Sequence, residues 1–364
     1  MTASYLSRRH LIAGRDAYPL GVGCRPISGP AAIEGRPVGW ASVADSSAVD
    51  TLLCAHAKGA TVYDTSDVYG LGHSQRMLGR MLAQVPRSSV RITCTIGTYK
   101  GTGQHAYSSL NLFRQVEQTL ENLGVKQLDV LVLAHADFGP RDRYLEEARE
   151  TLQALRDSRD VAAIGMRMPG TLPTSPAASD LSIGHWGSQP RYDFLFEQLN
   201  PQVLSTAAHP IEPQTGDAAT AGARSGESIF AFARRHGAAT MIHEPLLHGL
   251  LTGKYGPDAD FSPGDVRTRY TPAELEIVDR GLEALRTRFG KDPQALARVA
   301  LHYCLRRCPD SIVLAGSSSP EQVNKNFEGL NAEVSDDDYA FAERAYATLH
   351  TALARHAASA KAVP

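Results

Sequence analysis

The chain has 364 residues, of which 43% are hydrophobic and 21% are charged, proportions that are ordinary for a globular enzyme. Its net charge of −2 and isoelectric point near 6.7 give no electrostatic reason to expect nucleic acid or an anionic membrane as a partner. No apolar run approaches the roughly 18 residues of a membrane span. The expected partner is a small-molecule substrate, and the choice between a monomer and a homo-oligomer stays open.

The N-terminal segment and the cysteines bear on localisation. Five scattered cysteines favour a reducing cytoplasm over a disulfide framework. Ser7–Gly14 imitates a twin-arginine export signal, but charge and proline follow it in place of an apolar stretch. We therefore expect residues 7–23 to form a β-hairpin that closes the bottom of a barrel, and we expect a cytoplasmic protein.

Strand-like and helix-like segments alternate along the chain. The expected strands are 19–24, 60–67, 90–97, 128–137, 161–167, 202–209, 238–246 and 311–316. Helical periodicity or helix start signals mark the segments 46–60, 74–84, 112–124, 144–157, 226–237, 272–289, 293–307, the segment after 318, and a terminal helix from Ser335. Eight such units predict an α/β fold, a (β/α)₈ TIM barrel with an N-terminal hairpin and a C-terminal helix. An open Rossmann sheet is less suitable because no G-x-G-x-x-G follows the first strand.

We expect a single barrel domain over residues 1–355 and a disordered tail over 356–364. Residues 170–190 are rich in proline, serine and glycine and break the alternation. This segment is expected to be a long loop over the active-site face.

Three motifs, in order along the chain, carry a family resemblance. They are YDTSDVYGLGHSQRMLGRML after the second strand, PLLHGLLTGKY after the seventh, and LAGSSSPEQVNKNF at the eighth. Together they resemble the aldo-keto reductase family over nearly the whole chain. The resemblance implies hydride transfer from NADPH to a carbonyl group, with a tyrosine as proton donor. It also implies a lysine, paired with an aspartate, that lowers the pKa of this tyrosine, and a histidine that orients the substrate.

Only two of these four catalytic positions match. Asp64 and Tyr69 stand at the family's spacing, whereas Thr95 replaces the lysine and Ala134 replaces the histidine. His135 is the next residue, but in a strand a shift by one residue turns a side chain to the other face unless a bulge brings it back.

At the other positions of the expected cofactor site, one end departs from the family pattern and the other end matches it. At the nicotinamide end, Arg167, Ser205 and His243 depart from the family pattern. At the other end, Ser319 is a candidate N-cap that leaves a helix N-terminus facing an anion. The expected NADP(H)-binding residues are Arg167, Ser205, Leu246, Gly316, Ser317, Ser319, Gln322 and Asn326.

Three functions remain open. The favoured one is redox-neutral proton chemistry, such as dehydration, cyclisation or isomerisation of a bulky oxygenated molecule in specialised metabolism. Its candidate catalytic residues are Tyr69, Asp64, His135, His243 and Glu244. The alternatives are an NADPH-dependent aldehyde or ketone reductase with a rebuilt site, and a non-catalytic NADP(H)-binding regulatory protein.

Each candidate also has a purely structural interpretation. Asp64 would then form a salt bridge, Tyr69 would belong to the core, and His243 and Glu244 would be a surface pair. In the reductase alternative, Lys100 and Arg167 are by position the substitutes for the missing lysine. His248 and His209 are expected to be structural, and no motif supports a metal site.

Overall fold

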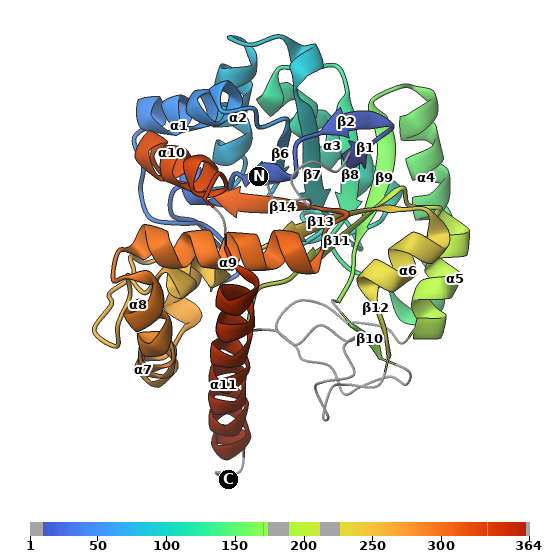
Figure 1. Ribbon diagram of the computed structural model, residues 1–364. Coiled ribbons are helices and arrows are strands. Elements are labelled where there is room, and N and C mark those ends of the chain that lie inside the picture. Colours follow the sequence, from blue (N-terminus) through green and yellow to red (C-terminus); the bar gives the residue numbers. More distant parts are fainter. Residues whose placement is uncertain (1–9, 170, 174–188, 212–225, 333, 362–364) are drawn as a thin grey trace.

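The computed structural model describes residues 10–169, 171–173, 189–211, 226–332 and 334–361. Eight parallel strands form a closed barrel and follow one another around it in chain order (Figure 1). The barrel strands are β3 (Leu20–Gly23), β6 (Val62–Ser66), β7 (Arg91–Ile96), β8 (Leu128–Leu133), β9 (Val161–Arg167), β11 (Val203–Ala207), β13 (Ala239–His243) and β14 (Ser311–Gly316). The predicted (β/α)₈ barrel is confirmed.

Helices surround the barrel, because each connection between parallel strands returns along its outside (Figure 1). They are α1 (Asp45–Ala57), α2 (His73–Leu82), α3 (Ser109–Leu123), α4 (Leu145–Asp157), α5 (Gln189–Leu199), α6 (Ile229–His236), α7 (Pro272–Gly281), α8 (Glu283–Phe289), α9 (Pro293–Arg307), α10 (Pro320–Gly329) and α11 (Asp336–Lys361). Buried side chains between these helices and the strands form the main hydrophobic core. In the described part of the chain, no helix has both the length and the apolarity that a membrane span requires.

Short elements complete the fold. In the described residues, three pairs of short strands lie outside the barrel wall or at its ends: β1 (His10–Ile12) with β2 (Arg15–Ala17), β4 (Ala32–Ile33) with β5 (Arg36–Pro37), and β10 (Thr171–Pro173) with β12 (Gly226–Ser228). The same residues contain the 3₁₀ turns η1 (Arg25–Ile27), η2 (Arg87–Ser89), η3 (Pro140–Asp142), η4 (Leu247–Thr252) and η5 (Val266–Arg269). Ile12 of the N-terminal hairpin is fully buried and packs in the barrel interior with Val62 and Val130. The hairpin therefore closes the bottom of the barrel, as expected, although it ends before β3 begins.

The structure corrects the expected helices in three places, and it describes only part of the expected long loop. The helix α5 was not expected, and the segment expected as one helix over 272–289 is two helices that meet at Leu282. The terminal helix α11 continues to Lys361, so residues 356–361 of the expected disordered tail are helical. Of the long loop expected over 170–190, only 171–173 and 189–190 belong to the described residues, and these lie in β10 and α5.

Candidate active site

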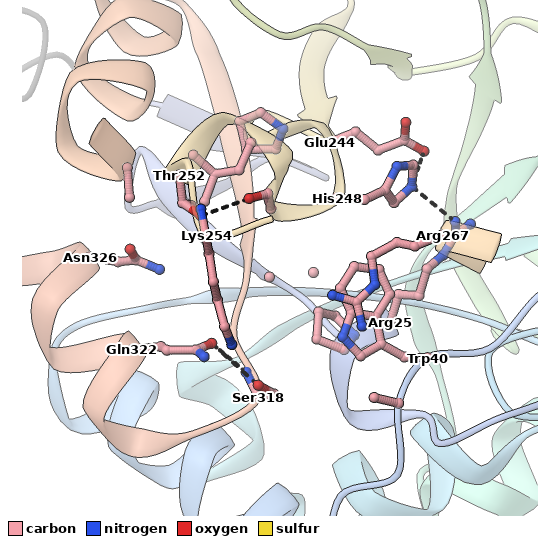
Figure 2. Close-up of a pocket in the computed structure, with 18 of the residues that line it drawn as sticks. Arg25, Trp40, Glu244, His248, Thr252, Lys254, Arg267, Ser318, Gln322 and Asn326 are labelled. Carbon is pink, nitrogen blue, oxygen red and sulfur yellow. Dashed lines mark hydrogen bonds and ion pairs between the residues drawn. The ribbon is translucent and has the colours of Figure 1, made fainter. Parts of the chain in front are cut away.

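A cavity of about 290 Å³ lies at the carboxyl ends of the barrel strands, where such folds carry their functional groups. Its wall begins with strand-end residues, among them Gly23 of β3, Asp64 of β6, His243 of β13 and Gly316 of β14. Side chains from the following loops and from α10 complete it (Figure 2). The cavity therefore joins the three motifs that carry the family resemblance.

Asp64 and Tyr69 both line this cavity. Thr93 Oγ1 of β7 donates a hydrogen bond of 2.6 Å to Asp64 Oδ1, and burial raises the pKa of Asp64 to about 6. Tyr69, in the turn after β6, is 6% exposed, and burial raises the pKa of its hydroxyl. The structure thus brings together a carboxyl group that titrates near neutrality and a buried phenol.

Arg25 lies against Tyr69 and was not predicted as a site residue. Its guanidinium carbon is 4.6 Å from the centroid of the Tyr69 ring. Burial lowers the pKa of Arg25, but the neighbouring Tyr69 and Glu244 raise it, and the net direction is upward. A sequence signal existed, since Arg25 is the second residue after the first barrel strand.

The positions of the missing lysine and histidine are occupied by small side chains. Thr95 and Ala134 are buried at the carboxyl ends of β7 and β8. Val130 and Val132 face the barrel interior, so alternation along the strand points Ala134 inward and His135 outward. The ring of His135 lies 4.6 Å from the ring of Tyr107, and His135 is absent from the described residues that line the cavity.

The two substitute cations proposed from the sequence lie in different places. Lys100 is exposed in the loop after β7 and does not belong to the described lining of the cavity. Arg167, at the end of β9, donates from Nε to His243 Nε2 at 3.0 Å. Burial, followed by the charge of Arg167, lowers the pKa of His243 to about 4, so this imidazole is neutral at pH 7. Arg167 therefore supports His243 from behind the cavity wall.

A tight bend after β13 places Glu244 and His248 in the cavity wall. Glu244 Oε1 lies 3.7 Å from His243 Nδ1 and 3.4 Å from His248 Nε2. Burial alone would raise the pKa of Glu244, but His248 and His243 hold it well below its usual range. Glu244, Leu247 and His248 all have positive φ angles (64°, 46° and 54°), a strained backbone conformation that clusters at functional sites.

The far end of the cavity is built around the N-terminus of α10. Ser319 caps this helix by accepting a bond from the Gln322 N–H at 3.3 Å. The Gln322 side chain in turn accepts a bond of 3.0 Å from the Ser318 N–H. Lys254 extends along the cavity toward Ser318 and Gln322 (Figure 2). A capped helix N-terminus beside an ammonium group suits an anionic ligand such as a phosphate.

Some of the other expected cofactor-binding residues line the cavity, and others are outside its described lining. Leu246, Gly316 and Asn326 line the cavity with Gln322. Ser317 and Ser205 are buried, and Ser317 accepts a bond of 3.2 Å from the Asn326 side chain. Neither serine, nor Ser319, is part of the described cavity lining. Within the described ranges, no group of three or more His, Cys, Asp or Glu residues is placed to hold a metal ion.

Comparisons with known proteins agree with this architecture. The family profile "Aldo/keto reductase family" matches residues 29–210 and 218–347. The NADH-specific methylglyoxal reductase of Escherichia coli is 24% identical over 324 residues, which cover 84% of this chain and 90% of that protein. The L-galactose dehydrogenase of Arabidopsis thaliana is 25% identical over 286 residues, 78% of each chain. The structure of a glycerol dehydrogenase from Gluconobacter oxydans matches with a TM-score of 0.67, at 20% identity and over 97% of both chains.

Proposed function

Because the chain belongs to the aldo-keto reductase family, we propose that it is an NADP(H)-dependent oxidoreductase that reduces the carbonyl group of a small molecule. The observation that carries the proposal is the single cavity that joins the α10 N-terminus to Tyr69. An anion-binding helix end and a buried proton donor at opposite ends of one cavity match the requirements of a dinucleotide and its substrate.

The chain's own groups would bind the cofactor and deliver a proton. Lys254 and the backbone N–H groups before α10 would hold a phosphate, and Gln322 and Asn326 would line its surroundings. When bound, the reduced nicotinamide supplies a hydride. As the carbonyl carbon accepts that hydride, the carbonyl oxygen takes the proton of the Tyr69 hydroxyl. Tyr69 is left as a tyrosinate, which regains its proton from water.

This proposal differs from the function that the sequence favoured. The sequence favoured redox-neutral chemistry because the family's lysine and histidine are both replaced while the rest of the pocket is kept. In the structure, Arg25 places a cation against Tyr69. The redox-neutral reaction stays a second candidate because Asp64 could serve as its base. A carboxyl group whose burial raises its pKa to about 6 can act as a base near neutral pH, without any hydride donor.

The decisive test measures binding and turnover separately. NADPH and NADH are titrated against the purified protein by fluorescence, and NADPH oxidation is then followed with a panel of aldehydes and ketones. The expected result is tighter binding of NADPH and carbonyl-dependent oxidation. Binding without oxidation of NADPH by any carbonyl compound would contradict the reductase and favour redox-neutral chemistry or a regulatory role. Failure of both dinucleotides to bind at millimolar concentration would contradict the cofactor assignment.

A further inference from the structure

Loss of the proton from the buried Tyr69 hydroxyl carries an electrostatic cost. A tyrosine that gives up its proton becomes a phenolate, and a buried phenolate is unfavourable without a nearby positive charge. Burial raises the pKa of Tyr69, and Asp64 and Glu244 raise it further. At the third strand, where the family's lysine would stand, the chain has the uncharged Thr95. The cation has to come from another strand.

Arg25 is placed to supply that charge. Its guanidinium carbon lies 4.6 Å from the Tyr69 ring centroid, on the face of the ring. Of the groups that lower the pKa of Tyr69, Arg25 has the largest effect and Arg167 a smaller one. Arg167 is also committed elsewhere, because its guanidinium contacts the His243 ring at 3.0 and 3.3 Å.

The surrounding side chains hold Arg25 in this position. Arg25 Nη1 lies 3.4 Å from His248 Nε2, and His248 Nδ1 lies 2.8 Å from the Tyr270 hydroxyl. The His248 ring lies beside Arg25 (Figure 2), and the backbone of His248 has a positive φ angle of 54°. Burial lowers the pKa of His248 and the charge of Arg25 lowers it further, against the opposing effect of Glu244, so the guanidinium favours the neutral imidazole beside it. Arg25 in η1, His248 in η4 and Tyr270 after η5 thus form a continuous set of contacts that joins three segments of the fold.

We propose that Arg25 takes the place of the family's lysine: its guanidinium stabilises the negative charge that develops on Tyr69 as the hydroxyl proton leaves. The proposal deepens the proposed reductase function and, for catalysis, rests on it. Arginine suits this role because it stays charged when buried and stacks on aromatic faces. A phenolate ring carries more electron density than a phenol, so the same contact is stronger after proton transfer. Arg25 is thus a positioning residue that acts through Tyr69.

The test reads the ionisation of Tyr69 directly and does not depend on turnover. The protein is labelled with 3-fluorotyrosine, and the ¹⁹F resonance of residue 69 is assigned by its absence from Tyr69→Phe. Its pKa is then followed by NMR in the parent, Arg25→Gln, Arg25→Lys and Arg80→Gln. Arg80 is a matched control, since it forms an exposed ion pair with Asp45 away from the cavity. We expect Arg25→Gln to raise the pKa of Tyr69 by about one unit or more, and Arg25→Lys to raise it less.

Kinetics on the same variants separate this inference from the proposed function. In Arg25→Gln, kcat for carbonyl reduction should fall about 10- to 100-fold, with KM and NADPH affinity nearly unchanged. Adding Thr95→Lys to Arg25→Gln should restore part of kcat, because it returns a cation to the third strand. An unchanged pKa of Tyr69 in Arg25→Gln would overturn the inference whatever the turnover. A parent that reduces no carbonyl, but whose Tyr69 pKa still depends on Arg25, would overturn the reductase function and leave the role of Arg25 standing.

Discussion

Tyr69 is the residue on which the proposed chemistry depends. In the proposed reaction its hydroxyl is the proton donor, and Tyr69→Phe removes that hydroxyl while keeping the ring that stacks with Arg25. We expect NADPH-dependent activity to fall by about 10²–10⁴-fold, the usual contribution of a general acid. Steady-state kinetics and a thermal melt check the loss and the intact fold.

A matched variant shows whether the effect is specific to the site. Tyr303→Phe removes a hydroxyl from α9, where the ring packs on Tyr339 and Tyr346 outside the described cavity lining. Its activity should equal that of the parent. If Tyr69→Phe retained activity within a factor of about three, Tyr69 would not be the general acid.

Asp64 links the site to the pH dependence of stability. Its pKa is about 6 in the folded protein against a usual value of 3.8, so folding favours its protonated form. The stability that this group contributes is fully present below pH 3.8 and is lost as the pH rises through 6. This difference in pKa corresponds to about 3 kcal/mol of stability, which is lost between pH 3.8 and pH values above 6.

Asp64→Asn should remove this dependence. The free energy of unfolding of the variant, relative to that of the parent, should therefore increase by up to about 3 kcal/mol between pH 4 and pH 7.5. Urea unfolding at several pH values measures the difference, and the comparison cancels other titrating groups such as Asp67. A difference that stays constant over this range would mean that Asp64 is ionised in the folded protein at low pH.

Residues of the site were predictable only in part. Local motif spacing identified Asp64 and Tyr69, whereas His135, kept as a catalytic candidate because a bulge could turn it inward, lies outside the described cavity lining. The cation on Tyr69 was missed because a side chain from the first strand reaches a turn after the second. Such a meeting depends on three-dimensional packing, although the position of Arg25, the second residue after its strand, was a usable signal.

At the scale of elements, α10 connects helix capping with ligand binding. Ser319→Ala removes the side chain that accepts the Gln322 N–H, and this should cost about 1 kcal/mol of stability. Since the same helix end faces the proposed phosphate, NADPH binding should also weaken several-fold. Calorimetric titration of NADPH and chemical unfolding of the variant measure the two effects.

The control uses another helix cap. Thr271 caps α7 through a capping box with Glu274, and neither residue belongs to the described cavity lining. Thr271→Ala should lose a similar amount of stability and bind NADPH as the parent does. Equal NADPH affinity in both variants would argue against a phosphate at the N-terminus of α10.

Elements themselves were largely predictable, because hydrophobic periodicity is a local property. The failures have physical causes. The helix α5 begins within the expected loop over 170–190, and its remaining residues, 191–199, were assigned to no element. The last turns of α11 were expected to be disordered because terminal residues of a domain are often poorly ordered. Alanine-rich sequence is nevertheless a good helix former when it continues an existing helix.

At the scale of the whole molecule, two distant segments join beside the cavity. The Gly39 N–H donates to the Gly264 carbonyl at 3.1 Å, and the Val266 N–H donates to the Gly39 carbonyl at the same distance. The guanidinium carbon of Arg267 lies 4.0 Å from the Trp40 ring centroid, and both side chains line the cavity. The two segments follow β3 and β13, which lie on either side of β14 in the closed barrel. Because this proximity depends on barrel closure, the contact was not predictable from sequence.

The contact between Trp40 and Arg267 should govern how fast a bound dinucleotide leaves. Trp40→Leu keeps an apolar side chain but removes the cation–π contact, whose usual energy of about 1–2 kcal/mol corresponds to roughly a tenfold change in rate. We therefore expect NADPH to dissociate about ten times faster, measured by stopped-flow fluorescence with an excess of competitor. Phe341→Leu is the control, since Arg288 lies 5.0 Å from that ring, which packs against Phe289 away from the cavity. If both variants released NADPH at the rate of the parent, the joined segments would not restrain the cofactor. Faster release in Trp40→Leu alone would support a restraint on the cofactor by these two loops, which follow β3 and β13.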